Sequence, residues 1–179
     1  DSSSDKMSLI MGIEQKLEII DTLGVDIVHV INFTNTFAET TAVDFLNHTV
    51  IPNFNPEYII IGYDHHFGYK REGSPEFLKH YCAEKKIGLD IIQPVSDEGH
   101  VISSTRIRQL IQEGFVRRAN FELGSIYGFL AKVVYGAGRG KGLNFPTANV
   151  IPVEKNQLMP KPGVYFTRGR INGLRLYGM

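Results

Sequence analysis

The chain has 179 residues, of which 42% are hydrophobic and 21% charged, so it is long enough for one large domain or a medium domain with a smaller one attached. Its 19 basic and 19 acidic residues balance, so no net charge favours nucleic acid or an anionic membrane. No apolar run approaches the ~20 residues that cross a bilayer, and the first residues lack the features of a signal peptide. Cys82 is the only cysteine, which excludes an internal disulfide and predicts a reducing, cytoplasmic setting.

The first part of the chain alternates between helix and strand patterns. Apolar residues at helical spacing predict a helix over 13–23, with Gly24 as its C-terminal cap. The nearly continuous apolar run 25–33 predicts a strand covered on both faces. A capping-box-like Thr and Asp open a predicted helix over 41–51, and residues 58–63 predict another buried strand.

The same alternation continues to about residue 114. Ser74 and Pro75 begin a predicted helix that Gly88 ends, and the single cysteine lies on its apolar side, as a core residue rather than a nucleophile. Residues 89–95 then predict a strand and residues 103–114 a helix. The alternation predicts an α/β fold with a parallel, doubly wound sheet, whose ligands bind beyond the carboxyl ends of the strands.

After about residue 123, glycine and short β-rich runs replace this alternation. Short strands separated by Gly and Pro turns predict a small barrel or sandwich. We expect the domain boundary near residues 124–128.

The start of the helix over 103–114 carries the features of a phosphate site. Ser103, Ser104 and Thr105 can cap the helix, and its free N–H groups can bind an anion. Arg106 and Arg108 lie in the first turn, where positive charge opposes the helix dipole unless an anion is nearby. Their side chains lie about 200° apart, so they cannot easily face one phosphate. A capped surface helix with two solvated arginines fits the same pattern equally well.

A polar segment, GYDHHFG over 62–68, follows the predicted strand 58–63. Its Asp64 lies where a ligand crevice is expected, although a turn aspartate bonded to its own backbone is the alternative. The histidines at 65 and 66 are adjacent, which is unsuitable spacing for a metal pair on one element.

The glycine-rich segment 136–150 is neither a P-loop, because Lys141 is followed by Gly142, nor a dinucleotide fingerprint, because no helix follows. In an extended strand, Thr147 and Asn149 project from the same face and offer oxygen donors suited to Mg²⁺. Taken alone, this segment is more simply an edge strand with an early proline.

Together these motifs resemble those of the bacterial bifunctional riboflavin kinase/FMN adenylyltransferases, the FAD synthetases, over nearly the whole chain. ISSTRIR over 102–108 resembles the nucleotidyltransferase signature of that family, and GYDHHFG resembles its G-x-D-x-x-F-G segment. GAGRGKGLNFPTAN over 136–149 resembles the flavokinase signature, with Asn144 in the place of the usual glycine. The implied site residues are Ser104, Thr105 and Arg108 for ATP phosphates, Asp64 and Phe67 for nucleotide or flavin, Gly136, Gly138 and Gly140 for the kinase phosphate loop, and Thr147 and Asn149 for Mg²⁺.

The resemblance implies a Rossmann-like adenylyltransferase domain over 1–124 and the start of a small antiparallel β-barrel riboflavin kinase domain over 125–179. It implies ATP-dependent phosphorylation of riboflavin to FMN, followed by adenylylation of FMN to FAD with release of pyrophosphate. We expect small-molecule partners only, with the protein a monomer or a weak homo-oligomer.

Two features of the family are not found in this sequence: its H-x-G-H motif and the glutamate base of its kinase. We therefore expect the catalytic residues to lie outside this segment, and the isolated segment to be inactive or impaired. An adenylyltransferase for another small phosphorylated substrate, and a non-catalytic flavin- or nucleotide-binding regulator, are the alternatives.

Overall fold

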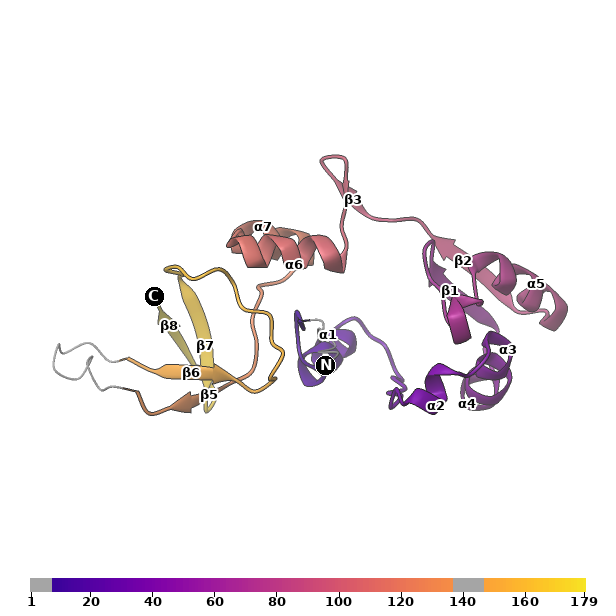
Figure 1. Ribbon diagram of the computed structural model, residues 1–179, viewed down its shortest axis with the longest axis horizontal. Coiled ribbons are helices and arrows are strands. Elements are labelled where there is room, and N and C mark those ends of the chain that lie inside the picture. The colour runs from indigo at the N-terminus through magenta and orange to yellow at the C-terminus, as the bar shows by residue number, and fades with distance from the viewer. Residues whose placement is uncertain (1–7, 137–146) are drawn as a thin grey trace, which may run out of the picture. The chain divides into compact units, whose positions relative to one another are not determined.

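The computed structural model describes residues 8–136 and 147–179 (Figure 1). They form two compact units. One is His29–Val101, and the other joins the described residues up to Val28 to those from Ile102 onward.

The unit His29–Val101 contains short helices, a parallel strand pair and a hairpin. Its elements are α2 (Asn35–Ala38), α3 (Ala42–Phe45), the π-helix η1 (Leu46–Val50), α4 (Ile51–Phe54), β1 (Tyr58–Gly62), the 3₁₀-helix η2 (Tyr69–Arg71), α5 (Pro75–Lys85), β2 (Gly88–Ile92), β3 (Ser96–Asp97) and β4 (His100–Val101).

The helix expected over 41–51 is confirmed as the run α3, η1 and α4, which continues to Phe54. Thr41 begins it: its Oγ1 accepts a hydrogen bond from the Asp44 amide at 3.1 Å and donates one to the Asp44 carboxylate at 2.7 Å. Asn55 ends it in the left-handed conformation, with φ of 40°.

A parallel pairing of β1 and β2 places Tyr58 opposite Gly88 and Gly62 opposite Ile92. The connecting helix α5 packs Leu78, Tyr81 and Cys82 into the core of this unit. Cys82 is only 2% exposed and burial raises the pKa of its thiol, which confirms its expected core role.

The strand β1 is confirmed, but its predicted burial on both faces is wrong. Ile59 and Ile61 pack against the core cluster, whereas Ile60 is 65% exposed. Within the described part of this unit, core packing covers one face of the pair only.

The expected end of α5 at Gly88 is also wrong. The helix ends at Lys85, and Lys86 takes the left-handed cap with φ of 59°. Gly88 instead begins β2, where a Cβ atom would collide with the ring of Tyr58.

The strand expected over 25–33 is not formed. This stretch has no strand in the structure, Ile27 and Phe33 are exposed, and the boundary between the units falls between Val28 and His29. A β-branched sequence forms a strand only where a partner strand accepts its hydrogen bonds, and no described strand pairs with it.

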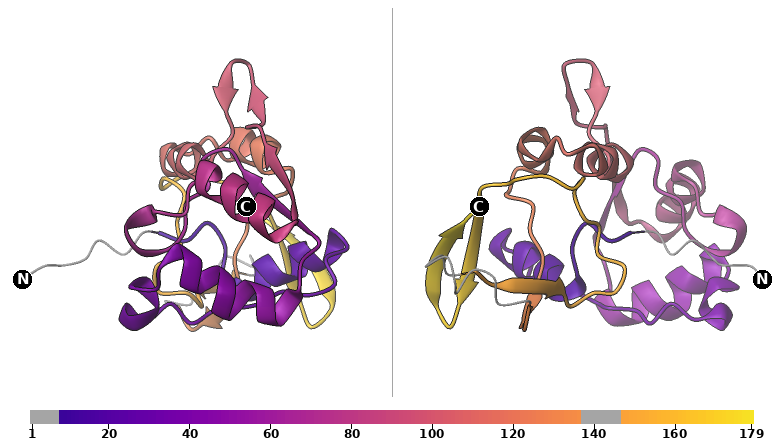
Figure 2. Two further views of the ribbon diagram at one scale, coloured as in Figure 1. Left: turned by 90° about the vertical axis from the view of Figure 1, so that its right-hand side faces the viewer. Right: turned by 60° about the vertical axis from the view of Figure 1, so that its left-hand side comes forward.

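The second unit contains three helices and two antiparallel strand pairs among its described residues. These elements are α1 (Ile13–Thr22), α6 (Ser104–Glu113), α7 (Val116–Leu123), β5 (Ala131–Val134), β6 (Asn149–Pro152), β7 (Thr167–Ile171) and β8 (Leu174–Gly178). The helices α6 and α7 lie side by side (Figure 2). Ile107 and Ile111 of α6, Ala119 of α7 and Leu158 form the buried core of this unit.

The fold is therefore mixed α/β, with a parallel strand pair and small antiparallel pairs. The pairs are β3–β4, β5–β6 and β7–β8, each a separate two-stranded sheet. Helices predicted over 13–23 and 103–114 are confirmed as α1 and α6.

Candidate functional site

The start of α6 has the geometry of an anion-binding helix end. Ser103 is the N-cap, and its hydroxyl accepts a hydrogen bond from the Arg106 amide at 3.3 Å. Ser104 and Thr105 follow in the first turn and are exposed. Their backbone N–H groups point out of the helix end, so this turn can bind an anion in front of it.

Arg106 is not free to bind that anion. Its Nε atom lies 2.9 and 2.8 Å from the two carboxylate oxygens of Glu122 on α7. Arg118 donates to the same carboxylate at 2.7 Å, and the Glu122 side chain has no exposed surface. The hydrogen bond from Arg106, assisted by Arg118, holds the pKa of Glu122 below its ordinary value although burial acts in the opposite direction. The positive charge of Arg106 therefore has an internal partner and gives no sign of a bound ligand.

Arg108 points to a different segment of the chain. Its Nε atom donates to the carbonyl of Ser8 at 3.0 Å, and its side chain is half-buried. Among the described residues, no protein group bonds its terminal Nη atoms. The expected divergence of the two arginines is thus observed, with Arg106 held by α7 and Arg108 by the segment at Ser8.

Asp64 follows the carboxyl end of β1 and is exposed. Its backbone carbonyl lies 2.9 Å from His66 Nδ1, which also contacts Arg71 at 3.2 Å. Asp64 lies in a turn in which the His65 amide donates to the Gly62 carbonyl at 3.1 Å, as the turn alternative expects. Within the described residues, however, its carboxylate accepts no hydrogen bond from its own backbone. The carboxylate is available to a ligand.

Phe67 belongs to the core of its unit as well as to the predicted site. Its ring packs against Phe45 at 5.6 Å and Phe77 at 6.2 Å between ring centroids. Gly68 follows with φ of 72°, and a Cβ atom there would lie 2.6 Å from the Ala42 amide nitrogen. Only glycine permits this approach of the loop to α3.

The predicted nucleotide-site residues fall in two units. Asp64 and Phe67 belong to His29–Val101, whereas Ser104, Thr105 and Arg108 belong to the unit that contains α6. Each group is a local feature of its own unit.

The predicted kinase residues lie around the β5–β6 pair. Asn149 pairs with Val134, and both Thr147 and Asn149 are exposed. A Cβ atom on Gly136 would collide with the Asn149 amide, so glycine makes room for that side chain. Gly138 and Gly140 lie outside the described residues.

Magnesium would have to be bound here by neutral oxygen atoms. Thr147 and Asn149 supply one hydroxyl and one amide oxygen, which fit Mg²⁺ when water and substrate phosphate complete its octahedron. In residues 8–136 and 147–179, no group of three or more His, Cys, Asp or Glu side chains could hold a metal ion.

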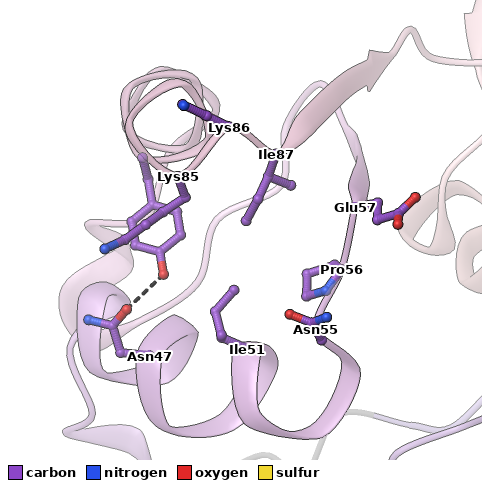
Figure 3. Close-up of a pocket in the computed structure, with 9 residues that line it drawn as sticks. Asn47, Ile51, Asn55, Pro56, Glu57, Lys85, Lys86 and Ile87 are labelled. Atoms are coloured by element: carbon purple, nitrogen blue, oxygen red, sulfur yellow. Dashed lines mark hydrogen bonds between the residues drawn. The ribbon is translucent and has the colours of Figure 1, made fainter.

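A hollow of about 540 Å³ lies where the chain enters β1 and β2 (Figure 3). It is lined by Asn47, Ile51, Asn55, Pro56, Glu57, Tyr81, Lys85, Lys86 and Ile87. Two of these residues are bonded to each other: the Tyr81 hydroxyl donates to Asn47 Oδ1 at 2.7 Å. Lys85 and Lys86 lie at the C-terminal end of α5, where positive charge complements the helix dipole and needs no ligand. Asp64 follows the opposite end of β1, so the hollow is separate from the predicted ligand crevice.

The sequence analysis missed α7 and its Glu122. Val116, Ala119 and Leu123 recur at helical spacing before Gly124, which has φ of 65° and caps the helix. That periodicity could have predicted α7, but nothing in the pattern distinguishes Glu122 from a surface acid.

In the described parts of the chain, no helix combines the length and apolar character needed to cross a membrane. The chain matches the FAD synthetase family over residues 2–106 and the riboflavin kinase family over residues 123–179. It is 36% identical to a bifunctional riboflavin kinase/FMN adenylyltransferase from Listeria monocytogenes, over 93% of this chain and 52% of the relative. A protein of the same description from Bacillus subtilis is 30% identical, over 92% of this chain and 51% of the relative.

A crystal structure described as a macrolide-efflux protein from Streptococcus pneumoniae is also similar. It aligns with a TM-score of 0.83 at 33% identity, covering 94% of this chain and 53% of that one. The chain thus spans about half the length of the curated relatives it matches.

Proposed function

This chain belongs to the FAD synthetase family, and we propose that its protein phosphorylates riboflavin to FMN and then adenylylates FMN to FAD. The observation that carries the proposal is the order of two matches in one chain, FAD synthetase over 2–106 and riboflavin kinase over 123–179. An adenylyltransferase for another substrate would not account for the second match.

We assign residues 1–124 to the adenylyltransferase domain and residues 125–179 to the riboflavin kinase domain. In this proposal, the parallel pair β1–β2 is part of a doubly wound, Rossmann-like sheet, and the strand pairs β5–β6 and β7–β8 are part of a small barrel. The protein would work in the cytoplasm on small molecules, as a monomer or a weak homo-oligomer.

For adenylylation, the start of α6 would hold the phosphates of ATP. The N–H groups and hydroxyls of Ser104 and Thr105 would bind phosphate oxygens, with Arg108 supplying the positive charge. Asp64 and Phe67 would contact the nucleotide or flavin. A phosphate oxygen of FMN attacks the α-phosphorus of ATP, and the bond to the departing pyrophosphate breaks. These residues would act by orienting the reactants and stabilising developing charge.

For phosphorylation, the γ-phosphate of a separate ATP would pass to the ribityl 5′-hydroxyl of riboflavin. Thr147 and Asn149 would hold Mg²⁺, with Gly136, Gly138 and Gly140 in the loop beside the phosphates. When bound, Mg²⁺ neutralises phosphate charge. The glycine at 136 would keep the Asn149 amide in place for this role.

Two substitutions in the natural full-length protein test whether the two reactions use separate sites. Arg108→Ala should reduce adenylylation of supplied FMN by roughly a hundredfold while largely sparing riboflavin phosphorylation, because it removes charge stabilisation at one site. Thr147→Ala should do the reverse. Rates of FMN and FAD formation, measured separately, give the comparison, and equal loss of both activities in either variant would contradict the proposal.

A further inference from the structure

Two segments far apart in the sequence are joined in the unit that contains α6. The Leu9 amide donates to the Asn156 carbonyl at 2.8 Å, and the Leu158 amide donates to the Leu9 carbonyl at 2.8 Å. Leu9 and Gln157 thereby form a parallel bridge. The first segment lies within the FAD synthetase match and the second within the riboflavin kinase match.

A buried amide reinforces this bridge. Gln157 is 9% exposed, and its Nε2 atom lies 3.1 Å from the Leu9 carbonyl, 3.2 Å from the Ile10 carbonyl and 3.1 Å from the Tyr127 hydroxyl. Tyr127 in turn donates to the Leu158 carbonyl. An NH₂ group has only two hydrogens, so these three acceptors, which come from two other segments of the chain, share them.

The bridge lies one residue away from the partner of Arg108. The Ser8 carbonyl, which accepts from Arg108 Nε at 3.0 Å, directly precedes Leu9. Leu9 is hydrogen-bonded to residues 156 and 158, so the position of the Ser8 carbonyl is set by the kinase-family segment. Because its Nε atom is bonded to Ser8, the Arg108 guanidinium can donate hydrogen bonds from both terminal nitrogens to two oxygens of one phosphate.

We infer that Gln157, a residue of the riboflavin kinase match, is a positioning residue for Arg108 in the adenylylation site. It fixes Leu9 and so the Ser8 carbonyl, which orients the guanidinium. This inference rests on the proposed role of Arg108. It goes beyond that role because Gln157 lies in the riboflavin kinase match but would affect the binding of ATP for adenylylation.

The test uses the natural full-length protein, with FMN and ATP supplied so that adenylylation is measured without the kinase step. Gln157→Met keeps the side-chain length and removes the hydrogen bonds. It should raise the KM for ATP in adenylylation about tenfold, since the arginine loses its fixed orientation, with little change in riboflavin phosphorylation. Gln109→Met is the matched control, because Gln109 is exposed on α6 and, among residues 8–136 and 147–179, its side chain bonds Glu113 alone, at 2.9 Å. It should leave the KM unchanged.

A double substitution separates positioning from general stability. In an Arg108→Ala background, Gln157→Met should give no further rise in the KM, although it would still lower the unfolding temperature. Tyr127→Phe removes only the hydroxyl beside Gln157 and should raise the KM for ATP to a smaller extent than Gln157→Met does. This variant replaces Gln157→Met in the test if the latter folds poorly.

An unchanged KM in both Gln157→Met and Tyr127→Phe would overturn the inference while leaving the proposed function intact, provided that Arg108→Ala raises the KM. Equal loss of both activities in Gln157→Met would also overturn it, as a purely structural effect. If Arg108→Ala itself leaves adenylylation unchanged, the proposed phosphate site and the inference both fail.

Discussion

The positive charge of Arg106 in the first turn of α6 suggests a bound anion, but a side chain of the protein itself compensates it. A positive charge in the first turn of a helix is unfavourable unless an anion compensates it. The compensating anion is Glu122, which is buried and receives hydrogen bonds from Arg106 and Arg118. Removing one member of such a buried charge cluster leaves the others unpaired, so the cluster is costly to break.

The buried carboxylate predicts a specific pH dependence of stability. The pKa of Glu122 is lowered in the folded state, so its contribution is complete above the ordinary pKa that a glutamate has in the unfolded chain and is lost as the pH falls through the lower folded-state pKa. Glu122→Gln should reduce the free energy of unfolding by about 1–3 kcal/mol near neutral pH. The difference from the wild type should persist down to the unfolded-state pKa of a glutamate and shrink as the pH falls through the lower folded-state pKa of Glu122. Urea unfolding followed from neutral to acidic pH measures both effects.

The matched control for this prediction is Glu113→Gln. Glu113 is on α6 but is exposed, and it accepts a hydrogen bond from Gln109. Its substitution should change stability by less than about 0.5 kcal/mol. A pH-independent difference between Glu122→Gln and the wild type would show that the ion pairs do not stabilise the unit.

At the scale of elements, the β5–β6 pair links a glycine to a proposed magnesium ligand. Gly136→Ala would place a Cβ atom on the Asn149 amide, and that amide can relieve the overlap by rotating. Riboflavin phosphorylation should therefore fall about tenfold, while the midpoint of thermal unfolding moves by less than about 4 °C. Gly169→Ala in β7 is the control, because a Cβ atom there meets nothing within 4 Å. Unchanged phosphorylation in Gly136→Ala would argue against Asn149 as a ligand.

The elements that could be predicted are those whose boundaries are set by local chemistry. Ser74 accepts a hydrogen bond from the Phe77 amide at 3.2 Å, and Ser103 caps α6, as their sequence positions predicted. The run 25–33 was mispredicted because its strand propensity depends on a distant partner, which composition cannot reveal. The hairpin β3–β4 was missed because two-residue strands carry almost no periodicity; only its Glu98-Gly99 turn, with φ of 48° and 79°, leaves a weak signal.

The candidate site could be predicted only in part for the same reason. The capping residues of α6 follow from local spacing, whereas the face that Thr147 and Asn149 were expected to share stays a prediction, because β6 begins only at Asn149. The partners of Arg106 and Arg108 do not, because Glu122 lies 16 residues along the chain and Ser8 lies 100 residues away. Contacts of that range are set by packing, so they became visible only in the folded chain.

At the scale of the whole molecule, the two family matches in one chain support two successive reactions on one flavin. The FAD synthetase match includes Ser104 and Thr105 at the start of α6, with Arg108 two residues beyond its end, and the riboflavin kinase match includes the residues proposed around β5–β6. The bridge between Leu9 and Gln157 joins segments from both matches, so the two regions are not structurally independent within that unit.

The most direct test of this account is incubation of the natural full-length protein with riboflavin, ATP and Mg²⁺, with the flavins separated by chromatography over time. The account predicts that FMN forms first and then declines as FAD accumulates with pyrophosphate. Tight flavin binding with neither FMN nor FAD formed would contradict it.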